Sequence, residues 1–283
     1  MPVLRVIMIG DVVGEPGLGI LEKLLPGLKK KHSADAVIVN GENAAGGFGL
    51  SAETLDRILA AGADVVTGGN HVWEKREFWP VLDAVRDPRP VIRPANYPGG
   101  TRRPLVPPLP GRGFLPLEIN GFPLLVINLQ GRELLSSVDC PFDCFDRIFD
   151  EQTGPGQAGG PAGPRAVIVD FHAEASEEKE ALAYYLDGRA SLVAGTHTHV
   201  QTADERILPR GTGYITDLGM TGAVNGVIGM DAKICINRAR TQVAYRMECA
   251  AGGRGNCAVQ GIAAEIDGES GKTLSITRIQ ERL

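Results

Sequence analysis

Six short runs of apolar, mostly β-branched residues recur along this chain of 283 residues and limit the folds open to it. The runs cover residues 3–9, 35–40, 63–68, 122–128, 165–170 and 191–195. Runs of this length and composition predict strands that are buried on both faces. Segments of helical periodicity follow the first, second and fifth runs, and this alternation predicts an α/β fold with a largely parallel sheet.

The ends of the predicted helices are marked by residues with suitable side chains or backbone freedom. Ser51 and Ser176 stand where an N-cap is expected, because a serine hydroxyl can accept a hydrogen bond from the first turn. Gly62 and Gly188 stand where these two helices are expected to stop.

The C-terminal third has a different pattern. Alternating runs at 257–267 and 273–280 are joined by "GESGK" and predict an antiparallel hairpin, with a second sheet packed on the first. The Gly- and Pro-rich segment 153–164 predicts a surface loop or a flexible insertion before a strand. No linker divides the sequence convincingly, so residues 1–283 are expected to form a single domain.

Charge and composition exclude several classes of protein. The chain has 29 Lys plus Arg against 34 Asp plus Glu, a net charge of -5 that argues against extended binding of nucleic acid. No apolar run approaches the roughly 18 residues of a membrane span, and the start "MPVLRVIMIGDVVG" resembles a buried strand rather than a leader. We therefore expect a cytoplasmic protein. Its five cysteines predict reduced thiols, since their spacing matches neither a disulfide framework nor a common zinc ribbon.

Polar residues follow five of the predicted strands. They are Asp11 after the first; Asn40, Glu42 and Asn43 after the second; Asn70 and His71 after the third; Asp170 and His172 after the fifth; and His197 and His199 after the sixth. Because ligands of open α/β sheets bind beyond the carboxyl ends of the strands, we expect these side chains at one edge of one sheet. If residues 196–200 are extended, His197 and His199 point to the same side.

The types of donor in this set indicate a metal centre. Imidazole, carboxylate and amide oxygen together suit Mn, Fe, Co or Zn better than Ca or Mg. The donors are too many for one ion and suit two ions that share a carboxylate. Taken singly, Asp11 could instead cap a helix and each histidine could be structural, and His32 in "KKKHS" is interpreted as a surface residue.

Five blocks of the sequence resemble a known enzyme family. "GDVVG", "NGENAAGG", "GGNHVWE", "DFHAEAS" and "AGTHTHV" follow one another between residues 10 and 200 in the order typical of calcineurin-type metallophosphoesterases. The resemblance is closer to the YmdB-like subgroup of bacterial phosphodiesterases, which "INLQGR" and "YITDLGMTG" also resemble. It implies a four-layer α/β/β/α fold, a sandwich of two mixed β-sheets flanked by helices.

The resemblance also implies a set of metal ligands. Asp11, Glu42 and His199 would hold one ion; Asn70, His172 and His197 would hold the other, with Glu42 bridging both. Val13 stands where the broad family has a histidine ligand, and Asn43 could fill that gap. The subgroup is associated with iron, so two divalent or trivalent ions are expected, iron first, with manganese or zinc as alternatives.

The expected activity is hydrolysis of small phosphodiesters, and the resemblance implies that these are cyclic nucleotides, including those of the 2',3' type. A hydroxide bridging the two ions would attack the phosphorus, and His71 would assist the leaving group as general acid. His71 could instead fix Asn70 or a substrate oxygen. Asp170 and Glu174 could orient His172 or have ordinary strand-end and capping roles.

Two other functions remain open at this point. One is a phosphomonoesterase or nucleotidase with the same metals, and the other is a metal-containing signalling or scaffold protein that binds a nucleotide or a protein partner. "GESGKT" is interpreted as a hairpin turn rather than a P-loop, and "GFGLSA" as a loop into the helix capped by Ser51. The apolar, Gly-rich segment 218–230 could line a pocket or the interface of a homo-oligomer.

Overall fold

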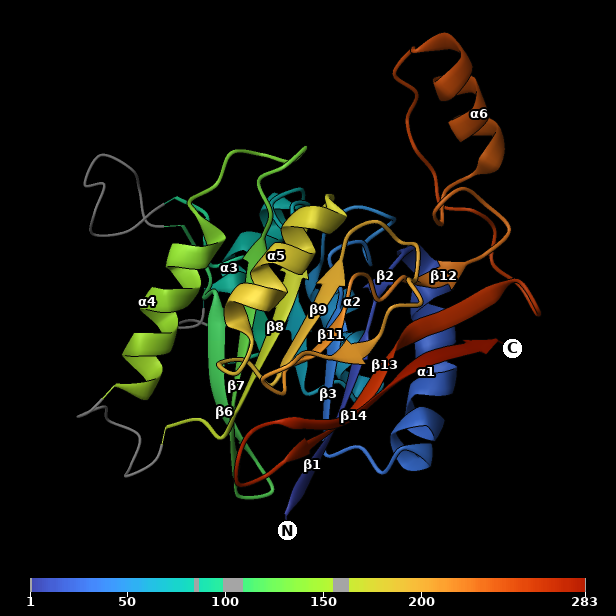
Figure 1. The fold of residues 1–283 in the computed structure, drawn as a ribbon. Helices are drawn as coiled ribbons and strands as arrows, with labels where there is room; N and C mark the ends of the chain where they lie inside the picture. Colours follow the sequence, from blue (N-terminus) through green and yellow to red (C-terminus); the bar gives the residue numbers. More distant parts are fainter. Residues whose placement is uncertain (1, 84–86, 99–108, 155–162, 283) are drawn as a thin grey trace.

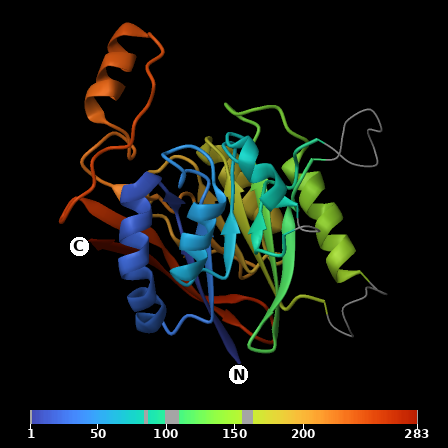
Figure 2. The same cartoon turned by 180° about the vertical axis from the view of Figure 1, so that it is seen from behind.

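Two β-sheets pack face to face, and helices cover the outer face of each (Figures 1 and 2). The computed structural model describes residues 2–83, 87–98, 109–154 and 163–282. Part of the predicted loop at 153–164 therefore lies outside the described residues, namely 155–162. The predicted four-layer α/β/β/α architecture is confirmed.

The first sheet has eight strands, most of them from the two ends of the chain. Their order is β2 (Asp11–Val12), β12 (Met220–Ala223), β13 (Cys257–Asp267), β1 (Val3–Ile9), β3 (Ala36–Asn40), β4 (Val65–Thr67) and β5 (Val91–Ile92), with β14 (Thr273–Arg282) paired to β13. Strands β1, β3, β4 and β5 are parallel, while β13 runs antiparallel to β1. The C-terminal hairpin predicted from the alternating pattern is confirmed, but it extends this sheet instead of starting another.

The second sheet has six strands from the middle of the chain. Their order is β10 (Arg206–Ile207), β11 (Gly213–Ile215), β9 (Leu192–Thr196), β8 (Ala166–His172), β7 (Phe122–Gln130) and β6 (Phe114–Ile119). Strands β7, β8 and β9 are parallel. The prediction that all the polar strand ends belong to one sheet is therefore wrong, because the third predicted strand is in the first sheet and the fifth is in the second.

The alternation of side chains in each strand builds three apolar layers. In β1, Leu4, Val6 and Met8 pack between the two sheets, while Ile7 and Ile9 pack under the helices. Two helices, α1 (Gly14–Lys31) and α2 (Ala52–Ala60), cover the first sheet. The second sheet is covered by α4 (Pro141–Thr153) and α5 (Ser176–Leu186). Burial on both faces explains why these strands appear as continuous apolar runs.

The predicted helix ends are largely confirmed. The Ser51 side chain accepts a hydrogen bond from the Thr54 backbone N–H and caps α2, into which the loop at 47–50 leads. Gly62 and Gly188 follow the two helices with positive φ angles of 115° and 84°, which glycine adopts at little cost. The prediction for Ser176 is wrong, since Ala175 is the N-cap of α5 and makes no side-chain capping bond.

The remaining helices are short or stand apart. A 3-10 turn (Arg76–Phe78) leads into α3 (Trp79–Leu82), and α6 (Ala232–Thr241) projects from the body of the molecule with no buried residue (Figure 1). In the apolar segment 218–230, β12 is buried in the first sheet, whereas Val227 and Ile228 are exposed. Among the described helices, none is both long and apolar enough to cross a bilayer.

Candidate metal centre

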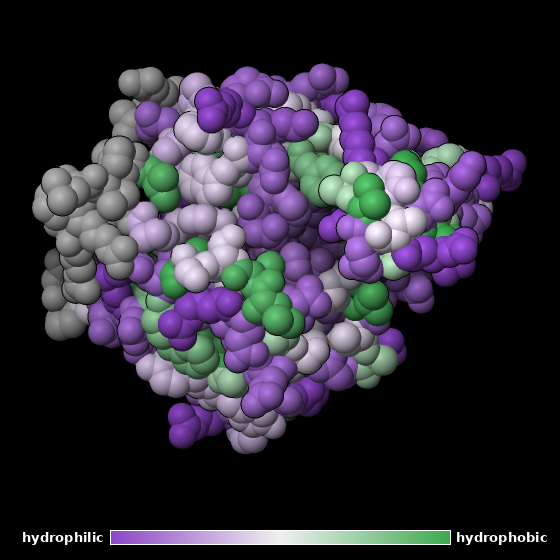
Figure 3. Space-filling model, turned by 90° about the horizontal axis from the view of Figure 1, so that it is seen from above, coloured by the Kyte–Doolittle hydropathy of each residue, from purple (hydrophilic) through white to green (hydrophobic). Residues whose placement is uncertain are grey.

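The carboxyl ends of strands from both sheets meet at one end of the sandwich. Glu42 follows β3 and Asn70 follows β4 in the first sheet, while His172 ends β8 and His197 follows β9 in the second. Asp11 comes two residues after the end of β1 and begins the short strand β2. The surface at this end is hollowed and largely hydrophilic (Figure 3). Five separate strand ends thus bring together the donors that the sequence predicted.

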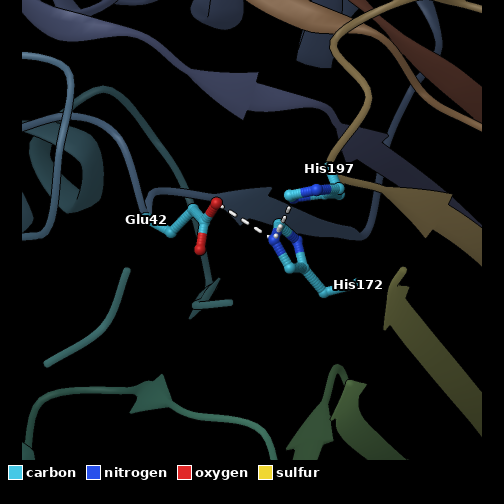
Figure 4. Close-up of side chains that lie close together, drawn as sticks. All are labelled: Glu42, His172 and His197. Carbon is cyan, nitrogen blue, oxygen red and sulfur yellow. Dashed lines mark hydrogen bonds and ion pairs between the residues drawn. The ribbon is translucent and has the colours of Figure 1, made fainter. Parts of the chain in front are cut away.

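Three donor atoms surround one imidazole nitrogen. His172 Nε2 lies 3.0 Å from Glu42 Oε1 and 3.0 Å from His197 Nδ1 (Figure 4). It also lies 2.8 Å from Asn70 Oδ1. A ring nitrogen carries at most one hydrogen, so hydrogen bonding alone does not account for three such neighbours. Two ligands at right angles, each about 2.1 Å from one ion, would lie about 3 Å apart. The cluster therefore fits the ligand shell of a metal ion, and Glu42, His172 and His197 form the group of candidate ligands found among the described residues.

A second group lies beside the first. Asp11 Oδ2 accepts a hydrogen bond from the His197 backbone N–H at 3.2 Å, while its Oδ1 is buried without a hydrogen-bond partner, 4.0 Å from His199 Nε2. Asn43 Nδ2 lies 3.1 Å from His199 Nε2 and donates to Glu42 Oε1 at 3.2 Å, so its amide would have to turn over to ligate through oxygen. An orphaned carboxylate oxygen among imidazoles suits a cation. The capping alternative for Asp11 is wrong, because Val13 is the N-cap of α1.

Burial and close charges shift the pKa values of these groups. Burial favours the neutral imidazole of His172, but the carboxylates of Glu42, Asp11 and Asp170 together outweigh burial and raise the pKa of His172 to about 9. Burial also opposes ionisation of Glu42, yet His172, together with His71, lowers the pKa of that carboxyl to about 2. Burial raises the pKa of Asp11 to about 6. Without metal the centre thus holds an ion pair, and a cation binding to His172 Nε2 must displace a proton.

A chain of hydrogen bonds orients His172. Its Nδ1 lies 2.9 Å from Thr196 Oγ1, which donates to Asp170 Oδ1 at 2.7 Å. Asp170 is buried and also accepts from Asn40 Nδ2 at 3.1 Å. The Thr196 hydroxyl gives its hydrogen to Asp170, so it accepts one from Nδ1 and leaves Nε2 facing the centre. Asp170 therefore acts on His172 through Thr196, a residue that the sequence analysis missed.

Glu174 contacts a different histidine from His172, the residue that the sequence analysis considered for it. Its Oε2 lies 3.0 Å from His197 Nε2, on the opposite side of that ring from the Nδ1 atom near His172. Burial, followed by the positive charge of His172, lowers the pKa of His197 to about 3. Glu174 thus contacts His197 rather than His172.

The backbone that carries the two neighbouring histidines is turned rather than extended. Strand β9 ends at Thr196, and His197 and His199 have φ angles of 103° and 63°. Such angles cost a residue other than glycine on the order of 1–3 kcal/mol. The extended geometry considered for residues 196–200 is therefore wrong, although both imidazoles still reach the centre, His197 at His172 and His199 at Asn43.

His71 lies at the edge of the cluster. Its backbone N–H donates to Glu42 Oε2 at 3.1 Å, and its Nδ1 lies 3.1 Å from Glu74 Oε1. The ring of Phe48 meets the imidazole edge-on, with 5.0 Å between the centroids. Because Nδ1 faces Glu74, a proton for a leaving group would come from Nε2.

Comparison with known proteins gives matches over nearly the whole chain. The model of one family, described as YmdB-like protein, matches residues 7–279. The 2',3'-cyclic-nucleotide 2'-phosphodiesterase of Bacillus subtilis (strain 168) is 44% identical over 98% of this chain and 96% of its own length. Among solved structures, a novel phosphatase from Mycoplasma pneumoniae has a TM-score of 0.86 at 30% identity, covering 100% of this chain and 94% of that one. A hypothetical protein from Thermus thermophilus has a TM-score of 0.83 at 39% identity, covering 99% of both chains.

Proposed function

The chain belongs to the YmdB-like protein family, and on that basis we propose that it hydrolyses small phosphodiesters, with 2',3'-cyclic nucleotides as substrates. The observation that carries the proposal is the convergence of Glu42, Asn70 and His197 on His172 Nε2, which suits a cation and therefore a phosphate. The activity named for the Bacillus subtilis relative supports the choice of cyclic nucleotides.

The proposed centre holds two divalent or trivalent ions, iron first, with manganese or zinc as alternatives. Asp11, Glu42, Asn43 and His199 would hold one; Asn70, His172, His197 and Glu42 would hold the other. Such ions polarise a phosphoryl oxygen and generate a nucleophile from water at neutral pH. Two divalent ions bring four positive charges, and the carboxylates of Asp11 and Glu42 return two. The remaining positive charge attracts a phosphodiester.

The residues of the chain position the substrate and supply the proton. The ligand side chains would hold the ions at the end of the sandwich where both sheets contribute strand ends, and the substrate phosphate would bind there. His71 stands outside the ligands, with its backbone fixed by Glu42 and its Nδ1 by Glu74. We assign His71 Nε2 as the atom that gives a proton to the departing oxygen. Self-association through residues 218–230, a single domain and a cytoplasmic location stay predictions.

Substrate comparison tests the proposed activity. We expect metal-loaded protein to hydrolyse 2',3'-cyclic AMP and bis(p-nitrophenyl) phosphate faster than p-nitrophenyl phosphate, and to lose both diesterase activities on chelation. Adding back Mn²⁺ or Fe²⁺ should restore them, because the donor set suits these ions. A strong preference for the monoester would identify a phosphomonoesterase instead. Absence of all three activities from fully loaded protein would favour a binding or scaffold role.

Replacing His71 by alanine tests its role as a proton donor. We expect kcat for 2',3'-cyclic AMP to fall about 10²–10³-fold with the metal content unchanged. The loss should be much smaller for bis(p-nitrophenyl) phosphate, because p-nitrophenolate leaves without a proton. Kinetics on both substrates, with metal analysis of the same samples, decide the point. Equal losses on the two substrates would assign His71 to substrate orientation.

A further inference from the structure

The turn that carries His197 and His199 needs support from outside itself. Both residues have left-handed backbone angles, which the turn does not favour by itself. Two backbone N–H groups of the turn donate to carboxylates, His197 N–H to Asp11 and Thr198 N–H to Asp217 Oδ2 at 3.1 Å. Asp11 belongs to the proposed ligand set, whereas Asp217 does not.

Asp217 lies behind the centre and connects several segments. Its carboxylate is almost wholly buried and accepts the Gly219 backbone N–H through Oδ1 at 2.8 Å. The carbonyl of Gly219 accepts the backbone N–H of Asp11 at 3.2 Å. Through Thr198 and Gly219, one carboxylate therefore fixes the backbone beside His197, His199 and Asp11, which come from both sheets.

Lys179 completes the arrangement. Its Nζ donates to Asp217 Oδ2 at 2.7 Å, and both side chains are only 1% exposed. It belongs to α5, the helix that follows the strand ending in His172. A buried ion pair adds little net stability, because the cost of desolvating both charges offsets much of their attraction. We therefore expect this pair to matter through the geometry that it enforces.

We propose that Asp217 and Lys179 are positioning residues that hold the turn 197–199 and the backbone of Asp11 in the geometry that binds metal. Neither residue touches the ligand atoms of the proposed centre. The segment "YITDLGMTG", which no ligand assignment uses, thereby gains a role through Asp217. The inference rests on the proposed function, since it presumes that the centre binds metal.

The test is a titration of chelator-treated protein with Mn²⁺, followed by electron paramagnetic resonance of the free ion. We expect Asp217→Asn to raise the dissociation constant about 10–100-fold, the range typical of residues that support metal ligands. Diesterase activity of this variant should recover as Mn²⁺ is raised. Lys179→Met should show the same loss of affinity for Mn²⁺. This second variant keeps the test decisive if Asp217→Asn fails to fold.

Asp187→Asn is the matched control. Asp187 is also a buried aspartate that accepts two backbone N–H groups, from Arg210 at 2.9 Å and Thr212 at 3.2 Å, but it follows α5, at the opposite end of that helix from His172. Its variant should lose stability and keep the wild-type dissociation constant. Wild-type affinity in Asp217→Asn and Lys179→Met overturns the inference, as does a result in which neither folds while Asp187→Asn does. If the wild-type chain binds no Mn²⁺, the proposed function fails first.

Discussion

Replacing Glu42 by glutamine is expected to lower kcat/KM for 2',3'-cyclic AMP by about 10³-fold or more and to remove most bound metal. The Glu42 side chain is wholly buried, with Oε1 3.0 Å from His172 Nε2 and Oε2 accepting the His71 backbone N–H. Glutamine fills the same space, but it removes one of the two carboxylates in the centre and places an amide group, which does not ligate through nitrogen, among the donors. Kinetics and metal mass spectrometry on the same preparation measure both effects.

Glu178→Gln provides the control for this change. Glu178 is a buried glutamate whose carboxylate accepts the backbone N–H groups of Arg132 and Glu133, and it contributes nothing to the ligand set. Its variant should unfold at a lower temperature while keeping its metal. A Glu42→Gln protein with full metal content and wild-type activity would rule out Glu42 as the shared ligand.

The second large effect is expected from adding a single methyl group at Gly69. A Cβ atom there would lie 2.1 Å from Glu42 Oε2 and 2.5 Å from His172 Nε2, so both side chains must move. Their movement separates the donors, and we expect Gly69→Ala to lose metal binding and at least about 10²-fold in kcat/KM. Crowding at this buried place should also cost about 1–3 kcal/mol of stability. Metal analysis, kinetics and thermal unfolding measure the three effects.

The same substitution at Gly19 separates crowding from the general effect of a methyl group. A Cβ atom on Gly19 meets nothing within 4 Å, and the residue lies inside α1. Alanine favours the helix, so Gly19→Ala should gain up to about 0.5–1 kcal/mol with unchanged activity. If Gly69→Ala binds metal as tightly as Gly19→Ala, the metal does not lie between Glu42 and His172.

The strands were predictable because burial on both faces leaves a local signal, a run of apolar β-branched residues. The distribution of these strands between two sheets was not predictable, because each strand pairs with partners that lie far away in the chain. Residues of β1 pair with β13 near the other end, Ile9 with Gly261 for example, and nothing in either segment identifies the other. The same limit explains why the C-terminal hairpin was assigned to the wrong sheet.

The candidate ligands were predictable because each lies at the end of a strand or within three residues of one, and the common direction of parallel strands brings such ends together. Thr196 and Asp217 act through contacts with distant segments, and a threonine or aspartate near a strand end carries no distinctive signal. Lys179, in contrast, did carry a distinctive signal in the sequence. It falls on the same helix face as Leu182 and Leu186, so a lysine at an apolar position indicated a buried charge that needs a partner.

The place of β13 in the first sheet has a consequence for protein synthesis. This strand lies between β12 and β1, yet it comes from residues 257–267, after every candidate ligand from Asp11 to His199. On the ribosome the donors therefore emerge before the strand that joins the two halves of the first sheet. A growing chain cannot yet offer the finished arrangement of side chains. We therefore expect the proposed centre to take up metal late, after these residues have emerged from the ribosome and folded.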